Sequence, residues 1–215
     1  MLRREAALAW AGGGGAATPV GFLLGACAFT PLAVGSERDL LARVGPPLLV
    51  VFLALSALMT FERLFQPDLE DGSLDQWALS PWPMELFAAL KGLAALAAIG
   101  APLAAIGTPL ALTLQAPPQS LPVLLGAIAL ALCAFFGVGL FGGALAAGVR
   151  RSGLLIAVIV LPFLAPPLIF AAGAVSEAVR GGEPAGPLLM LAGCAAFALG
   201  LGPIGAAAVL RAHLD

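Results

Sequence analysis

Residues 121–148 read LPVLLGAIALALCAFFGVGLFGGALAAG and contain no charged side chain. An α-helix needs about 20 predominantly apolar residues to cross the hydrocarbon core of a bilayer, so this run predicts a membrane-spanning helix. Hydrophobic residues make up 61% of the 215-residue chain and charged residues only 10%, a balance that no soluble domain requires. The sequence therefore predicts an all-α membrane protein that crosses the bilayer several times.

Five more apolar runs give a total of six predicted spans within one integral membrane domain, residues 1–215. The six spans are residues 19–34, 45–60, 85–114, 121–148, 153–175 and 187–210. Pro102 and Pro109 predict a kink in the third span, because proline removes a backbone donor. The fifth span contains Pro162, Pro166 and Pro167. It is expected either to kink strongly or to stop near Pro166, with a second apolar piece that dips back into the membrane.

The segments before the first span and between the first two spans lie outside the predicted membrane-spanning helices. Residues 1–16 contain Arg3 and Arg4 beside apolar side chains, which fits a short interfacial helix or an ordinary positively charged N-terminus. Residues 12–15 are four glycines, a hinge and not a phosphate loop, because no Lys-Ser/Thr pair follows them. Residues 35–44 are expected to form a short charged loop.

The distribution of Lys and Arg predicts the orientation. Six spans place both termini on one side of the membrane, and this side carries seven basic residues against three on the other. The seven are Arg3, Arg4, Arg63, Lys91, Arg150, Arg151 and Arg211, and the three are Arg38, Arg43 and Arg180. Cytoplasmic loops are enriched in Lys and Arg, so both termini are expected in the cytoplasm.

The longest polar interruption is the acidic loop, residues 61–84, which reads FERLFQPDLEDGSLDQWALSPWPM. It holds five of the twelve acidic residues of the chain against one basic residue, Arg63. The five are Glu62, Asp68, Glu70, Asp71 and Asp75. By the charge count above, the acidic loop lies in the cytoplasm and presents a strongly negative surface there.

A short helix is predicted inside the acidic loop. Asp71-Gly72 is a turn signal, and Ser73 followed by Gln76 fits a capping box at a helix start. Pro81 and Pro83 are expected to end this helix.

One face of the short helix is apolar and consists of Leu74, Trp77 and Ala78, at helical spacing. Trp77 and Trp82 would also suit a helix that lies among lipid headgroups. Helices on membrane surfaces usually carry Lys and Arg, whereas this one carries acid, which favours a docking surface for a soluble partner.

The sequence predicts no catalytic, metal or cofactor site in this chain. The single histidine, His213, lies in the C-terminal tail, and no P-loop sequence occurs. Cys27, Cys133 and Cys194 lie in apolar runs without CxxC spacing. The pattern Gly139-x-x-x-Gly143 is typical of close helix packing, more often within one chain than in a dimer.

The acidic loop also resembles a known family. Its segments Glu62-Arg63-Leu64-Phe65, Asp68-Leu69, Asp71-Gly72-Ser73-Leu74, Gln76 and Leu79-x-Pro81-x-Pro83 resemble the cytoplasmic loop of the CcmB family. Further segments match that family in order along the chain: Phe29-Thr30-Pro31-Leu32, Leu40-Leu41-Ala42-Arg43, Arg150-Arg151-Ser152-Gly153 and Val160-Leu161-Pro162. A looser pattern, Glu70, Gly72-Ser73-Leu74, Ser80-Pro81 and Lys91, is shared with type-2 ABC exporter permeases. The glycines at 12–15 depart from the family pattern.

The resemblance implies a bacterial inner-membrane subunit of the haem exporter system for cytochrome c maturation. It implies a cytoplasmic ATPase partner, CcmA, and the membrane partners CcmC and CcmD. ATP bound to CcmA would be hydrolysed there to help release the haem-loaded chaperone CcmE from CcmC, so the complex, and not this chain, would handle haem and ATP. A homodimer is also possible within such a complex.

On this interpretation the amphipathic helix of the acidic loop is the coupling element. Its apolar face would enter a cleft on the ATPase, while acidic side chains at the rim meet Arg or Lys. The residues assigned to coupling are Glu62, Arg63, Asp68, Glu70, Asp71, Gly72, Ser73, Leu74, Asp75, Trp77, Ala78 and Pro81. Two alternatives stay open: a type-2 ABC exporter permease for a lipid or drug, and a scaffold that holds CcmC and CcmD without transport.

Overall fold

The computed structural model describes residues 16–35, 37–147 and 153–213. The long helices are α2 (Ala17–Val34), α3 (Arg38–Phe61), α6 (Met84–Ala95), α7 (Ala101–Thr113), α8 (Leu121–Ala146), α9 (Gly153–Arg180) and α10 (Ala185–Ala212). The short elements are α4 (Gln66–Glu70), α5 (Ser73–Ala78), the π-helical turn η1 (Leu96–Gly100) and the 3₁₀ turn η2 (Pro118–Ser120). In the described residues these helices form six segments long and apolar enough to cross a membrane, which makes this a multi-pass membrane protein.

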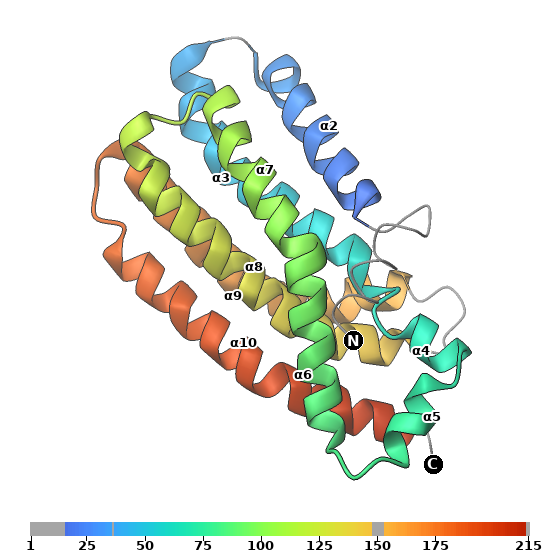
Figure 1. Cartoon of the computed structure of the whole chain (residues 1–215). Coiled ribbons are helices and arrows are strands. Elements are labelled where there is room, and N and C mark those ends of the chain that lie inside the picture. Colours follow the sequence, from blue (N-terminus) through green and yellow to red (C-terminus); the bar gives the residue numbers. More distant parts are fainter. Residues whose placement is uncertain (1–15, 36, 148–152, 214–215) are drawn as a thin grey trace.

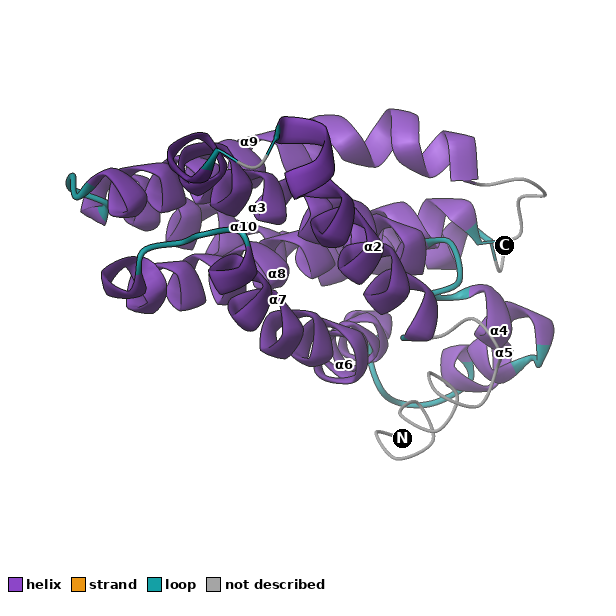
Figure 2. Ribbon diagram, turned by 90° about the horizontal axis from the view of Figure 1, so that it is seen from above, coloured by secondary structure: helices purple, strands orange, loops and turns teal. Residues whose placement is uncertain are grey.

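The bundle is organised around α8, which packs against α3, α9 and α10 (Figures 1 and 2). Its buried side chains include Leu124, Phe135 and Phe136. Helix α2 covers α3 at the edge of the bundle, and its apolar outer face is largely exposed. The short helices α4 and α5 lie together at one end of the bundle, beyond the ends of the long helices (Figure 1).

The predicted spans agree closely with the observed helices for the first, third, fourth and sixth. The second helix starts earlier than expected, at Arg38, so only the segment around Gly35 and Glu37 connects α2 to α3. Asp39 lies in the first turn of α3, where the helix dipole favours a negative charge. The charged residues of the expected loop therefore begin the second helix. The expectations for residues 1–15 and for Arg150 and Arg151 lie outside the described residues.

The third span is irregular where the sequence predicted it. The π-helical turn η1 ends at Gly100, and Pro102 is the second residue of α7, which begins at Ala101. Because proline lacks an amide hydrogen and crowds the preceding turn, a π-helical turn relieves the mismatch in backbone pairing. The ribbon changes direction between α6 and α7 (Figure 1).

The fifth span corrects the expectation of a broken or re-entrant segment. Helix α9 runs without interruption from Gly153 to Arg180 and includes Pro162, Pro166 and Pro167. Each proline removes one amide donor, but helices of membrane proteins tolerate this when neighbouring helices enclose the affected turns. Helix α9 packs against α3, α8 and α10, and Pro167 is buried, whereas Pro162 and Pro166 are exposed.

The backbones of α8 and α10 approach each other closely. A Cβ atom placed on Gly137 would lie 2.6 Å from the carbonyl carbon of Ala198, and a Cβ on Gly202 would collide with the carbonyl of Gly137. Gly139 and Gly143 face Phe61 at the end of α3. The small-residue pattern of α8 therefore serves contacts within the chain, as the sequence indicated.

The α8–α10 contact leads to the first prediction. Gly137→Ala is expected to lower the free energy of unfolding by about 1–3 kcal/mol, because the added methyl group meets rigid backbone atoms of α10. Gly193→Ala is the matched control, since nothing lies within 4 Å of its added Cβ. Thermal unfolding of both variants in detergent measures the difference. Equal melting temperatures would contradict the close packing of α8 on α10.

Candidate partner-docking site

The acidic loop leaves the membrane-spanning bundle at Phe61 and returns to it at Met84. Between these residues the chain forms α4, a tight turn, and α5, which lie side by side at one end of the bundle (Figure 1). The loop thus has its own fold, and its two ends are tied to the ends of α3 and α6.

Aromatic side chains hold the loop against the bundle. Phe65 is fully buried and its ring centroid lies 6.2 Å from that of Phe87 on α6. Trp77 of α5 packs on the same Phe87 at 5.3 Å, and its indole Nε1 donates to the carbonyl of Pro83 at 3.4 Å. Leu74 is 1% exposed and belongs to the main hydrophobic core. Helix α5 therefore uses its apolar face to bind its own chain.

The start of α5 differs from the predicted capping box. Gly72 occupies the cap position with φ +72°, a left-handed conformation that suits glycine. The backbone amide of Ser73 donates to the Asp71 carboxylate at 2.9 Å, and the Ser73 hydroxyl contacts Asp68 Oδ1 at 3.2 Å. Ser73 is therefore the first helical residue and not the cap, because the Asp71 side chain already accepts from the amide at the helix start.

A buried ion pair ties α4 to the membrane-spanning part of the chain. Lys91 Nζ on α6 lies 2.6 Å from Asp68 Oδ2 on α4, with both side chains less than a tenth exposed. A charged group at this depth is costly unless it is paired, so each partner stabilises the charge of the other. Asp68 thus connects Lys91 on one side to Ser73 and the start of α5 on the other.

A second, exposed ion pair joins the C-terminal helix to the same end of the bundle. The guanidinium of Arg211 on α10 donates to both carboxylate oxygens of Glu85, at 2.7 and 2.8 Å. Exposed pairs of this kind contribute little to stability. The pair does, however, place the end of α10 next to the point where the acidic loop rejoins α6.

The outer surface of the loop combines acid with exposed apolar side chains. Leu79, just after α5, is 90% exposed and Trp82 is 61% exposed. Glu70, Asp71 and Asp75 are exposed on the same short segment of chain. We call these five residues the docking surface. An exposed tryptophan and leucine beside acidic groups are typical of a surface that another protein covers.

The structure divides the residues assigned to coupling from the sequence into two groups. The exposed ones are Glu62, Arg63, Glu70, Asp71, Asp75, Ala78 and Pro81, and the buried or half-buried ones are Asp68, Gly72, Ser73, Leu74 and Trp77. This corrects two details of the expected contact. Leu74 packs inside its own chain and is not free to enter a cleft, and Asp68 pairs with Lys91 instead of standing at an open rim.

Sequence reasoning missed the exposure of Leu79 and the ion pair of Lys91. Leu79 follows the predicted helix and was outside its apolar face, although an apolar residue between a helix end and Pro81 is a visible signal. Lys91 lies one turn or more inside an apolar span and so required a partner of opposite charge. Glu85 and the acidic loop were the nearest carboxylates in the sequence.

The comparisons with known proteins cover the whole chain. The family model described as CcmB protein matches residues 1–213. The chain belongs to the CcmB family. Proteins named heme exporter protein B resemble it along their full length: the Paracoccus denitrificans protein is 39% identical over all of this chain and 98% of its own. The Pseudomonas aeruginosa protein is 39% identical over 98% of this chain and 95% of its own.

A more distant relative gives the same result. The heme exporter protein B of Escherichia coli K12 is 34% identical over all of this chain and 98% of its own. Family membership therefore extends over the six spans and the acidic loop alike, as the motif order in the sequence predicted. No group of three or more His, Cys, Asp or Glu side chains that could hold a metal ion occurs in the described ranges of this CcmB-family chain.

Proposed function

We propose that this chain is the membrane permease subunit of an ABC transporter complex for haem export in cytochrome c maturation. The names of the full-length relatives support the haem-export part of this proposal. In this complex the chain supplies the membrane-spanning path and the docking surface, while a partner ATPase supplies hydrolysis. ATP stays on the partner, and haem is a substrate of the complex.

The proposal that the acidic loop couples the ATPase to the membrane helices rests on the contacts between this loop and α6. The docking surface is exposed, but directly beneath it Asp68 is paired with Lys91, and Trp77 is packed on Phe87. Both of these inner contacts end on α6. A movement of the docking surface caused by the ATPase would therefore be transmitted to α6, and to the π-helical turn that follows α6, through packed side chains.

We further propose the partners and the orientation that the sequence indicated. The ATPase is CcmA, the membrane partners are CcmC and CcmD, and hydrolysis helps to release the haem-loaded chaperone CcmE. The docking surface and both termini lie in the cytoplasm of a bacterial inner membrane, in keeping with seven basic residues on that side against three on the other.

Two substitutions in the loop test the coupling role. Gly72→Val forces a β-branched residue into the left-handed conformation at φ +72°, and Trp77→Ala removes the side chain that α5 packs on Phe87. Both are expected to tilt α5, to abolish co-purification of the ATPase and to stop cytochrome c maturation while membrane insertion stays normal. Gly72→Asn is the matched control, because asparagine tolerates this conformation far better than valine.

The outcome separates the coupling role from a passive one. Wild-type ATPase binding and wild-type cytochrome c maturation in both Gly72→Val and Trp77→Ala would contradict the proposal. A scaffold without transport predicts a different pattern, in which an ATPase that binds but cannot hydrolyse ATP leaves cytochrome c maturation intact.

A further inference from the structure

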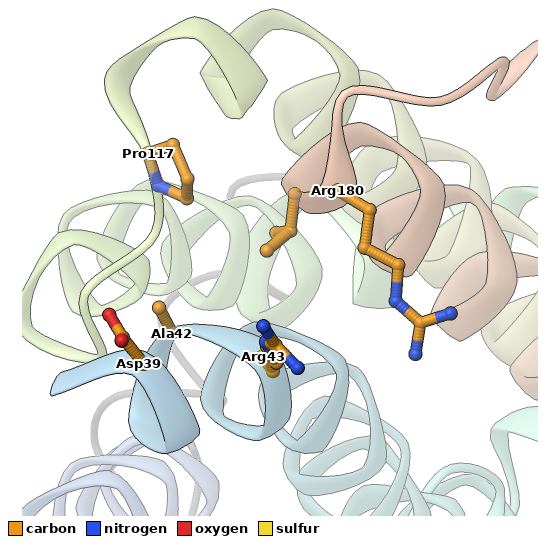
Figure 3. A pocket seen from close by; sticks show the side chains of 6 residues that line it. Asp39, Ala42, Arg43, Pro117 and Arg180 are labelled. Atoms are coloured by element: carbon orange, nitrogen blue, oxygen red, sulfur yellow. The ribbon is translucent and has the colours of Figure 1, made fainter. Parts of the chain in front are cut away.

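A cavity of about 590 Å³ lies at the end of the bundle opposite the acidic loop. It is bounded by the start of α3, the connection from α7 to α8, and the end of α9 (Figure 3). Its lining residues are Asp39, Ala42, Arg43, Pro117, Val179 and Arg180. Helix α3 places this cavity and the acidic loop at its two ends, so the two sites lie at opposite faces of the membrane.

Two arginines from different helices line the cavity. Arg43 comes from α3 and Arg180 from the last turn of α9, and both side chains are exposed (Figure 3). Within the described residues neither group forms an ion pair. A guanidinium has five N–H donors in a planar fork and no acceptor, which suits carboxylate and phosphate oxygens. Two such groups with no acid bonded to them are available to a ligand.

The rest of the lining is consistent with a ligand that has one charged end. Ala42, Pro117 and Val179 contribute apolar surface, and Asp39 is the single acid. The same end of the bundle also carries acidic residues close in sequence to the start of α3 and the end of α9, namely Glu37, Glu177 and Glu183. This face as a whole is therefore not basic. Attraction of an anion would therefore come from direct contact with Arg43 and Arg180 and not from a general positive field.

We propose that this cavity binds the anionic end of an amphiphile, with Arg43 and Arg180 donating to its phosphate or carboxylate oxygens. The cavity lies at the ends of the spans, where the headgroup region of a bilayer begins. Its volume is in the range of ligand sites in general. The chemistry is shared by the phosphate of an anionic phospholipid and by the two propionate carboxylates of haem, and only the haem arm rests on the proposed function.

The test measures ligand binding by the full-length chain in detergent. One arm compares phosphatidylglycerol with phosphatidylcholine of the same acyl chains, and the other compares haem with its dimethyl ester. Arg43→Gln and Arg180→Gln are each expected to weaken binding of the anionic member about tenfold or more, because each removes a charged hydrogen bond. Asp39→Asn should strengthen that binding, since it removes the only negative charge in the lining.

Arg38→Gln is the matched control, because Arg38 is an exposed arginine on the same helix that does not line the cavity. Loss of phosphatidylglycerol binding alone assigns the site to lipid, and loss of haem binding alone assigns it to haem. The proposal is overturned if the Arg43→Gln/Arg180→Gln double variant binds all four ligands as the wild type does, or if Arg38→Gln weakens binding equally.

This test is independent of the ATPase. Binding is measured on the isolated chain, whereas the coupling role is measured by ATPase co-purification with variants of the acidic loop. If the arginine variants leave ligand affinity unchanged while Gly72→Val still releases the ATPase, only the cavity proposal fails. If the arginine variants lose ligand while Gly72→Val keeps the ATPase, only the coupling role fails.

Discussion

Lys91→Met is expected to lower the free energy of unfolding by about 3–5 kcal/mol, because it leaves the buried Asp68 carboxylate without its nearest counter-charge. The two groups are 2.6 Å apart and both are less than a tenth exposed, so solvent screens them little. Thermal unfolding in detergent measures the loss. Limited proteolysis of residues 61–84 should show at the same time that α4 has come away from α6.

Two further variants make the Lys91 result specific. Replacing both partners, Lys91→Met with Asp68→Leu, is expected to recover most of the stability, since an apolar pair of similar size needs no charge compensation. Glu85→Gln breaks the exposed pair with Arg211 and should leave the melting temperature almost unchanged. Stability unchanged in Lys91→Met, or lost equally in Glu85→Gln, would contradict a buried pair that anchors the loop.

The second large effect concerns the docking surface. Trp82→Ala is expected to weaken association with the partner ATPase by about 2 kcal/mol or more, roughly thirtyfold, because a buried tryptophan is a typical hot spot of an interface. Trp82 is 61% exposed in the free chain, so its removal should not unfold the loop. Titration of the detergent-solubilised chain with purified ATPase measures the affinity.

The control for Trp82 is an equally exposed aromatic residue elsewhere. Phe197 on α10 is 69% exposed and lies within a membrane-spanning helix, where a soluble ATPase does not reach. Phe197→Ala should therefore leave ATPase affinity unchanged. The docking surface is misassigned if Trp82→Ala binds the ATPase as tightly as the wild type does, or if Phe197→Ala loses as much affinity.

The six spans could be predicted from the sequence because their signal is compositional. Long apolar runs without charge have one stable solution in a bilayer, and the observed helix ends lie within a few residues of those expected for most spans. The predicted stop of the fifth span near Pro166 was wrong, because α9 continues through Pro162, Pro166 and Pro167 to Arg180. A local rule for proline does not include the packing of α9 against three other helices.

The candidate site was located from the sequence, but its inner and outer faces were not distinguished. Periodicity assigned Leu74 and Trp77 to one face of a helix, and this is what the structure contains. Periodicity could not determine whether that face would meet a partner or the chain itself. The apolar face packs on the chain itself because Phe87 of α6 lies beside it, and this contact forms only in the folded structure.

The Asp68–Lys91 pair was missed for a related reason. From the sequence, Asp68 is interpreted as one of several surface charges in the acidic loop, and Lys91 is interpreted as an interfacial anchor near the start of a span. Their separation in the sequence gives no indication that α4 folds back onto α6. A buried charge in the span was the one available sign that a partner had to exist.

The central claim is that the acidic loop is the contact with the partner ATPase, and site-specific photo-crosslinking in intact cells tests it most directly. A photo-reactive residue placed at Leu79, which is 90% exposed, should form an adduct with the ATPase. The same residue at Glu37, at the other end of α3, should form none. Absence of an ATPase adduct at Leu79, or an equal yield at Glu37, would contradict the account.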